Sequence, residues 1–81
     1  MMIFPNPADN EIWVRVKERV YGNATIMITD ITGRQVYREN LGRVDLSDFN
    51  RKINLKDIVA GVYIIGLFTD NKFYIQKLII Q

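Results

Sequence analysis

The 81-residue chain contains no cysteine and no histidine. Without cysteine it can form neither a disulfide framework nor a thiolate metal site. Without histidine it lacks the commonest general base and metal ligand of proteins. Ser47 is the only serine, and no lysine accompanies it at helical spacing. Since an enzyme needs an activated nucleophile, a carboxylate pair or a cofactor, these absences predict a protein that is not an enzyme and binds no cofactor.

Charge of one sign and long apolar runs are also scarce. Eleven basic and nine acidic side chains give a net charge of +2, and no basic run is longer than Arg51-Lys52. Nucleic-acid binding usually needs a concentrated basic patch, which argues against that class. No segment approaches the roughly 20 apolar residues of a membrane-spanning helix, so no direct membrane insertion is expected. The N-terminus lacks the pattern of a secretory signal peptide, and its Met-Met start is consistent with a piece of a longer protein to which Met1 was added for expression.

The chain does contain hydrophobic residues, 48% of the total, and they alternate with a period of two. In the stretch EIWVRVKE, for example, Ile12, Val14 and Val16 share one face. Such alternation is typical of half-buried strands, and no segment shows the 3.6-residue period of a helix. The segment GVYIIGLFT is apolar on both faces, which indicates a central strand. The pattern predicts strands at residues 11–17, 24–30, 34–40, 43–48, 52–55, 61–69 and 72–80.

Turn residues separate these runs. Gly33 in DITGR is suited to a positive φ in a short hairpin. Asp70-Asn71 tolerate the left-handed region in the hairpin between the last two predicted strands. Gly22-Asn23 and Gly42 predict two further turns. Seven short strands at roughly ten-residue spacing predict an all-β, immunoglobulin-like antiparallel β-sandwich, with a small barrel as the alternative.

The N-terminal stretch FPNPADN has a different character. Pro5 and Pro7 bracket Asn6, and proline fixes its own φ and pushes the preceding residue toward extended conformations. Residues 1–10 are therefore expected to be a proline-containing lead-in from an upstream linker. Residues 11–81 are expected to form a single sandwich domain.

One tyrosine has a place typical of immunoglobulin-like sandwiches. These folds put a tyrosine near the start of one strand, with its hydroxyl bonded to the backbone a few residues upstream. In NLKDIVAGVYII, Tyr63 is predicted to form such a corner, and Asp57 to accept hydrogen bonds from free amides between Leu55 and Ala60. The alternative is that Tyr63 is simply a half-buried strand aromatic.

Two polar motifs are weak. Asp45, Asp48 and Asn50 are clustered oxygen donors, but they lack the glycine and distal glutamate of an EF-hand loop, so a solvated loop without metal is favoured. Asn23-Ala24-Thr25 matches the glycosylation acceptor pattern, a three-residue match that often arises by chance.

Three apolar side chains are candidates for a contact surface. Trp13 faces opposite to Ile12, and Phe73 and Ile75 leave the core face of the last predicted strand. Exposed apolar residues on a strand can mark a binding surface, although both faces of a central strand can also be buried.

Four landmarks in order resemble one known family. They are FPNPADN before the first strand, DITGRQV at a hairpin, INLKDIVAGVYII, and a final KFYIQKLIIQ. Together they are similar to the type A C-terminal sorting domain of proteins exported by the type IX secretion system of Bacteroidetes, over Phe4 to Gln81. The positions that match the family motifs are Pro5, Asn6, Pro7, Asp30, Gly33, Gly61, Tyr63 and Lys77. One departure is the terminal Gln81, where many members end in lysine or arginine.

The resemblance implies an immunoglobulin-like sandwich at the C-terminus of a larger secreted protein. Such a domain is read by the outer-membrane translocon and its shuttle protein, and a cell-surface sortase usually removes it at a site upstream of the sandwich. The cargo then reaches the cell surface or the medium, often attached to anionic lipopolysaccharide. The alternative is a non-catalytic adhesion or spacer module resembling fibronectin-like repeats, with binding by Trp13 or by loop aromatics.

A sandwich acts as an address through its surface. The last strand, Lys72 to Gln81, is expected to have an unpaired edge that a partner strand can extend. Lys77 and the face of Phe73 and Ile75 are expected to contribute to recognition by the translocon. The same edge is expected to allow a homodimer by strand pairing.

Overall fold

The computed structural model describes every residue from Met1 to Gln81. It contains seven strands and no helix, so there is no helix of the length and hydropathy needed to cross a membrane. The strands are β1 (Met2–Phe4), β2 (Glu11–Val16), β3 (Val20–Asp30), β4 (Gln35–Leu46), β5 (Phe49–Asn54), β6 (Gly61–Phe68) and β7 (Phe73–Ile80).

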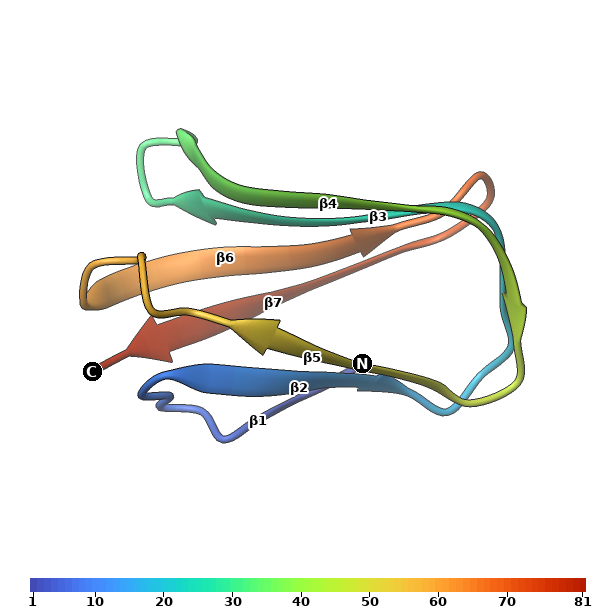
Figure 1. Ribbon diagram of the computed structural model, residues 1–81. Helices are drawn as coiled ribbons and strands as arrows, with labels where there is room; N and C mark the ends of the chain where they lie inside the picture. The colour runs from blue at the N-terminus through green and yellow to red at the C-terminus, as the bar shows by residue number, and fades with distance from the viewer.

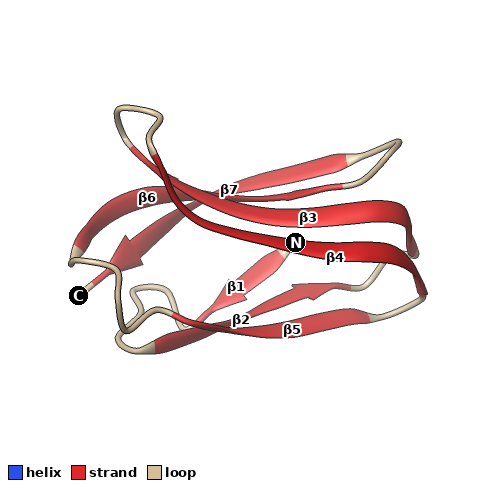
Figure 2. Cartoon of the chain, turned by 45° about the horizontal axis from the view of Figure 1, so that its top comes forward, coloured by secondary structure: helices blue, strands red, loops and turns tan.

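The strands form two sheets that lie face to face as two layers (Figure 2). One sheet has three strands in the order β1-β2-β5, and the other has four in the order β4-β3-β6-β7. All neighbouring strands are antiparallel. The prediction of an all-β antiparallel sandwich of about seven strands is thus confirmed, and two separate sheets rule out the small barrel.

One long two-stranded ribbon links the layers. Its ends are the β2–β5 pair and the β3–β4 pair, and it folds over where residues 17–19 and 47–48 connect them (Figure 1). Gly22 and Gly42 lie near this fold with φ of 97° and 71°, but both lie inside strands, opposite Val44 and Ala24. Predicting turns there was wrong, and the strands expected at 34–40 and 43–48 are one strand, β4.

A bulge explains why Gly42 resembles a turn residue. Gly42 faces Ala24 while Asn40 faces Thr25, which leaves Leu41 as an extra residue in β4. A bulge bends its strand and increases the local twist, and a glycine readily adopts the positive φ that it needs. The bend allows β4 to leave the four-stranded sheet and continue toward β5.

The space between the sheets is filled by a cluster of 17 buried hydrophobic residues. Alternate residues supply it, such as Ile12 and Val14 from β2, Ile26 from β3, and Ile65 and Leu67 from β6, all of which are fully buried. No polar or charged residue is buried. Burial of one such side chain contributes about 1.5–3 kcal/mol. Strand β6 lies between β3 and β7, as its apolar sequence predicted.

The N-terminal lead-in belongs to the sandwich. Met2–Phe4 form β1, which pairs with β2 so that Ile3 lies opposite Val14 and is buried. Beyond β1 the chain crosses to the other sheet, where the fully buried Ala8 forms a parallel bridge with Ile80. Met2–Phe4 and Ala8 of the lead-in thus pack as part of the two sheets. A strand of three residues directly before a proline is too short to display the alternation that reveals the others.

Candidate functional site: the motif end of the sandwich

The segment Pro5–Ala8, which we call the strap, lies along the edge of β7. The Asn6 Nδ2 group donates to the Lys77 carbonyl at 2.9 Å, and the Ile79 N–H donates to Asn6 Oδ1 at 3.0 Å. The Ala8 N–H donates to the Ile79 carbonyl and the Gln81 N–H donates to the Ala8 carbonyl, both at 2.8 Å. The strap thus pairs with β7 as a short additional strand does.

The two prolines explain why an asparagine lies between them. Neither Pro5 nor Pro7 has an N–H group, so the strap backbone cannot form a regular ladder with β7. The carboxamide of Asn6 carries an NH₂ donor group and a C=O acceptor, and so can replace the N–H and C=O of a peptide group. Its two hydrogen bonds to β7 replace the missing main-chain pair.

The strap also corrects the prediction of an unpaired terminal edge. From the Lys77 carbonyl to the Gln81 N–H, the β7 edge is bonded to Asn6 and Ala8. Only the first half of the strand, around Phe73 and Ile75, lacks a neighbour on that side. The sequence could not reveal this because the two partners are 71 to 73 residues apart.

Asn6 is expected to stabilise the domain measurably. Asn6→Ala removes two hydrogen bonds at the sheet edge and should lower the free energy of unfolding by about 1–2 kcal/mol. Urea denaturation followed by circular dichroism measures this, with Asn50→Ala as a matched control because Asn50 is exposed on β5 and its side chain makes no hydrogen bond within the protein. Equal midpoints for Asn6→Ala and the control would show that the strap adds nothing to stability.

Asp30 organises the β3–β4 hairpin. Its Oδ1 accepts hydrogen bonds from the Thr32 N–H, the Thr32 hydroxyl and the Arg34 N–H, at 2.9, 2.6 and 3.0 Å. The Gly33 N–H closes the turn on the Asp30 carbonyl, and Gly33 has the positive φ of 91° that its position requires. The hydrogen bond from Thr32 is the main cause that lowers the pKa of Asp30, and the Arg34 backbone and guanidinium act in the same direction.

This lowered pKa predicts an acid dependence. The carboxylate of Asp30 favours folding above its ordinary pKa of 3.8, and that contribution is lost as the pH falls below 3.8 through the lower folded-state pKa. Asp30→Asn should therefore lower the free energy of unfolding near neutral pH. The difference in this free energy between the variant and the wild type should become smaller in acid. Thermal melts from neutral pH down through this range measure the difference. The other carboxylates contribute equally in both proteins and therefore cancel from it. A constant difference across the range would contradict the role of the carboxylate charge.

Tyr63 is buried at the start of β6, and its hydroxyl donates to the Val59 carbonyl at 2.5 Å, four residues upstream. This is the backbone contact of a tyrosine corner. Gly61 lies against the same ring, since a Cβ on Gly61 would be 3.5 Å from Tyr63 Cε2.

The predicted contribution of Asp57 to this corner is wrong. Asp57 is exposed and accepts no hydrogen bond from the connection. The carboxamide of Asn54 accepts from the Lys56 N–H at 2.8 Å, and the Ile58 N–H donates to the Leu55 carbonyl. An asparagine bonded to the amide two residues ahead is an Asx turn, and its position at a strand end is the signal that could have identified it.

The structure brings the predicted motif positions to one end of the sandwich. Asp30 lies opposite Tyr63, and Tyr63 lies opposite Leu78 on β7. Gly61 lies opposite Ile80, which in turn contacts Ala8 of the strap. Figure 1 shows the C-terminus, the β3–β4 hairpin and the β1–β2 and β5–β6 connections together at the left of the view. This motif end comprises Pro5, Asn6, Pro7, Asp30, Gly33, Gly61, Tyr63 and Lys77.

Most of the polar side chains at the motif end are already engaged inside the protein. Asn6, Asp30 and Tyr63 each bond to backbone groups of their own chain. Lys77 differs, because its carbonyl receives the strap while its exposed ammonium group forms no ion pair. Of these residues, Lys77 is the one whose side-chain charge is free to bind another molecule.

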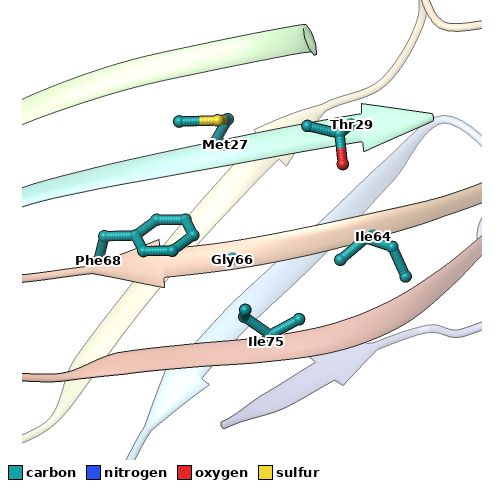
Figure 3. A pocket seen from close by; sticks show the side chains of 6 residues that line it. All are labelled: Met27, Thr29, Ile64, Gly66, Phe68 and Ile75. Carbon is teal, nitrogen blue, oxygen red and sulfur yellow. The ribbon is translucent and has the colours of Figure 1, made fainter. Parts of the chain in front are cut away.

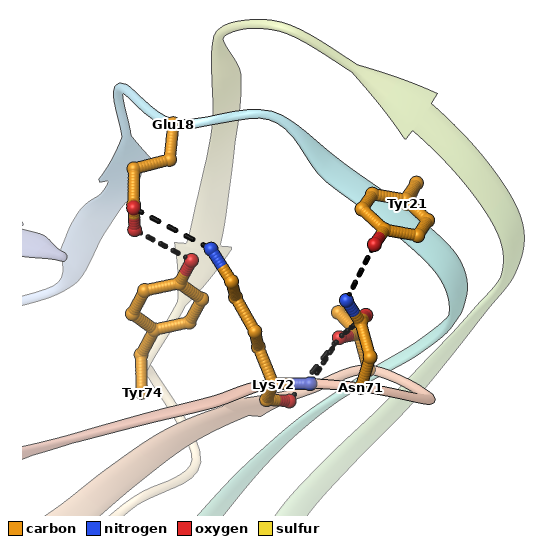
Figure 4. A network of polar contacts seen from close by, with 6 residues as sticks. Glu18, Tyr21, Asn71, Lys72 and Tyr74 are labelled. Atoms are coloured by element: carbon orange, nitrogen blue, oxygen red, sulfur yellow. Dashed lines mark hydrogen bonds and ion pairs between the residues drawn. The ribbon is translucent and has the colours of Figure 1, made fainter.

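The opposite end is held by a polar network (Figure 4). Glu18 accepts hydrogen bonds from the Tyr74 hydroxyl at 2.8 Å and from Lys72 Nζ at 3.5 Å, and Asn71 Nδ2 donates to the Tyr21 hydroxyl at 2.7 Å. The bond from Tyr74 and the charge of Lys72 lower the pKa of Glu18. These contacts hold the β6–β7 hairpin against the β2–β3 connection.

The two carboxylates considered as calcium ligands are engaged in separate ion pairs. Asp45 binds the Arg19 guanidinium at 2.8 and 3.0 Å, and Asp48 contacts that of Arg15 at 3.3 and 3.4 Å. Asn50 lies on β5. No group of three acidic side chains that could hold a metal is formed. Asn23, from the glycosylation pattern, donates to Asp70 instead.

The comparison with protein families matches nearly the whole chain. A family model described as "Secretion system C-terminal sorting domain" matches residues 2–81, a range that begins with β1 and includes the strap. No curated protein matches the sequence.

Proposed function

Since this chain belongs to the family of secretion system C-terminal sorting domains, we propose that it directs a larger cargo protein through the outer-membrane translocon of the type IX system. The family is a sorting signal rather than a catalyst, and such a signal implies export across the outer membrane of Bacteroidetes to the cell surface or beyond. The address is a folded surface, since no reactive centre is required to carry it.

The observation that supports this proposal best is the shared location of the motif residues. Positions that lie far apart in the sequence, from Pro5 to Lys77, converge on one end of a rigid sandwich. Their hydrogen bonds keep the strap and β7 together, so that a reader of the domain meets one fixed shape. The motif positions thereby contribute to recognition chiefly by holding that shape, with Lys77 in direct contact.

The partners follow from the family. We propose that the translocon and its shuttle protein bind the folded domain, and that a cell-surface sortase then cleaves upstream of β1. The released cargo is attached to anionic lipopolysaccharide or leaves the cell. A homodimer through β7 would use the half of the edge that the strap leaves unpaired, and sedimentation velocity at high concentration tests it.

A second function is favoured by the other sheet. Phe4 and Trp13 lie opposite each other on β1 and β2, and both are 39% exposed, with Met2 beside them at 46%. Exposed aromatics on a sheet can bind a partner. An adhesion or spacer module would use this face and would be retained in the mature protein, whereas a sorting domain is removed.

A fusion experiment distinguishes the two functions. Residues 1–81 are joined to the C-terminus of a fluorescent protein that carries a Sec signal, in a Bacteroidetes strain with and without its type IX translocon. The sorting function predicts fluorescence at the surface or in the medium only when the translocon is present. Retention in the periplasm of both strains would contradict it.

A further inference from the structure

The unpaired half of β7 presents main-chain groups to solvent. In an antiparallel pair, the N–H and C=O groups of alternate residues point toward the neighbour and away from it. The main-chain groups of Ile79 and the N–H of Gln81 point away from β6, because they form hydrogen bonds with the strap. By the same alternation the N–H and C=O groups of Phe73 and Ile75 and the N–H of Lys77 also point away from β6. None of these main-chain groups has a hydrogen-bond partner within the protein. We call the outward groups of Phe73 to Lys77 the open edge.

The side chains of the open edge continue an apolar surface. Phe73 and Ile75 are 69% and 55% exposed on the outer face of the four-stranded sheet, the face away from the core. Next to them is a hollow of about 150 Å³ around Gly66 (Figure 3), where the ring of Phe68 lies 2.6 Å from the place that a Cβ on Gly66 would take. The hollow is lined by Met27, Thr29, Ile64, Gly66, Phe68 and Ile75. A long apolar side chain from a strand beside β7 can lie across Ile75 toward it.

The charged side chains nearest the open edge on the outer face are both cations. Lys77 lies on this face beside Ile64, and Arg38 lies on it opposite Met27. Neither cation forms an ion pair. The side chains that line the hollow between Lys77 and Arg38 are apolar or threonine, and the one carboxylate that β4 places on this face, Asp45, lies beyond the bend and is paired with Arg19. The face is therefore complementary to a partner that is apolar and acidic.

We propose that the open edge binds a short extended segment of a partner protein, which adds to the sheet beside β7. Its main chain pairs with Phe73 to Lys77, an apolar side chain packs on Phe73 and Ile75, and a carboxylate faces Lys77. The strap occupies the edge beyond Lys77 and so limits the segment's length. The open main-chain groups favour a protein strand over a lipid surface, since lipid supplies no regular ladder. This inference rests on the proposed sorting function and assigns the segment to the export machinery.

Two kinds of variant test it in the fluorescent fusion. Ile75→Pro removes an outward N–H while keeping the bonds to β6, and proline is tolerated on an edge strand of this kind. Surface delivery should fall about tenfold, the effect of losing about 1.4 kcal/mol of binding, whereas Ile75→Ala should keep most of it. Lys77→Glu should reduce delivery severalfold, and Lys56→Glu, a matched exposed lysine without an ion pair, should not. Thermal melts show whether each variant folds. If Ile75→Pro does not fold, Ile75→Lys replaces it as a substitution that hinders strand pairing at the edge.

The outcomes separate the two proposals. Delivery of the wild type together with loss in the folded edge variants supports strand addition. Delivery of Ile75→Pro, Ile75→Lys and Lys77→Glu at the wild-type level overturns it and leaves the sorting function standing. No delivery of the wild type contradicts the sorting function, and with it the premise of strand addition. Flotation of the purified domain with phosphatidylglycerol vesicles, abolished by Lys77→Glu but not by Ile75→Pro, would assign the face to a lipid surface and overturn the proposal.

Discussion

Deletion of Lys77–Gln81 is expected to unfold the domain. It removes the buried side chains of Leu78 and Ile80 and every hydrogen bond between the strap and β7. Loss of one buried leucine or isoleucine side chain typically costs about 2–5 kcal/mol. A domain of this length has a total stability of about 4–12 kcal/mol. The two losses together are thus comparable to the whole stability of the fold.

Circular dichroism and urea denaturation of the purified proteins measure this effect. Deletion of Gln81 alone is the matched control, because it removes one main-chain hydrogen bond and should cost only about 0.5–1.5 kcal/mol. A truncated chain that unfolds cooperatively at the wild-type midpoint would contradict the account. The prediction also means that loss of export after truncation reflects unfolding as well as recognition, so folded point variants are needed to isolate recognition.

Tyr63→Ala is expected to have the second-largest effect. It empties the site of a buried aromatic ring and removes the hydrogen bond to the Val59 carbonyl, and should lower the free energy of unfolding by about 3–5 kcal/mol. Tyr63→Phe removes only the hydroxyl and should cost about 1–2 kcal/mol.

The comparison of these two variants separates the free-energy contribution of the packed ring from that of the hydroxyl hydrogen bond at the corner. Chemical denaturation of both proteins supplies the two free energies. If Tyr63→Phe were as stable as the wild type, the hydroxyl would contribute nothing and Tyr63 would be an ordinary core aromatic. If Tyr63→Ala were nearly neutral, the ring would not belong to the core.

Much of the fold could be predicted because alternation is a local property. The pattern of Ile12, Val14 and Val16 identified β2, and the doubly apolar sequence of β6 identified a central strand. Gly22 and Gly42 were misread, since a turn and a bend within a strand both require a positive φ that glycine supplies. Only the pairing partner distinguishes the two, and pairing is not a local property.

Less of the candidate site could be predicted. The motifs predict a set of positions, but not that Asn6 bonds to β7 or that this closes half of the β7 edge. That contact joins residues from opposite ends of the chain, and no local pattern specifies it. The prediction for Asp57 failed for another reason, because Asn54 is also a turn-forming residue and its position at the end of β5 lets it accept from the Lys56 N–H.

The structure gives the motif residues a common physical role. Asn6 closes an edge, Asp30 organises a hairpin and Tyr63 fixes a corner, all at one end of the sandwich. The proposed recognition of the domain by its surface requires such a fixed shape. The groups left free for a partner then lie along Phe73 to Lys77 of β7, and Lys77 is the one residue of the motif end among them.

Amide hydrogen exchange along β7, measured by NMR, tests this half-closed edge most directly. The N–H groups of Phe73, Ile75, Ile79 and Gln81 all point away from β6, so they form an internal comparison within one segment. The account predicts slow exchange at Ile79 and Gln81, which bond the strap, and fast exchange at Phe73 and Ile75. Exchange at Ile79 and Gln81 as fast as at Phe73 and Ile75 would contradict it.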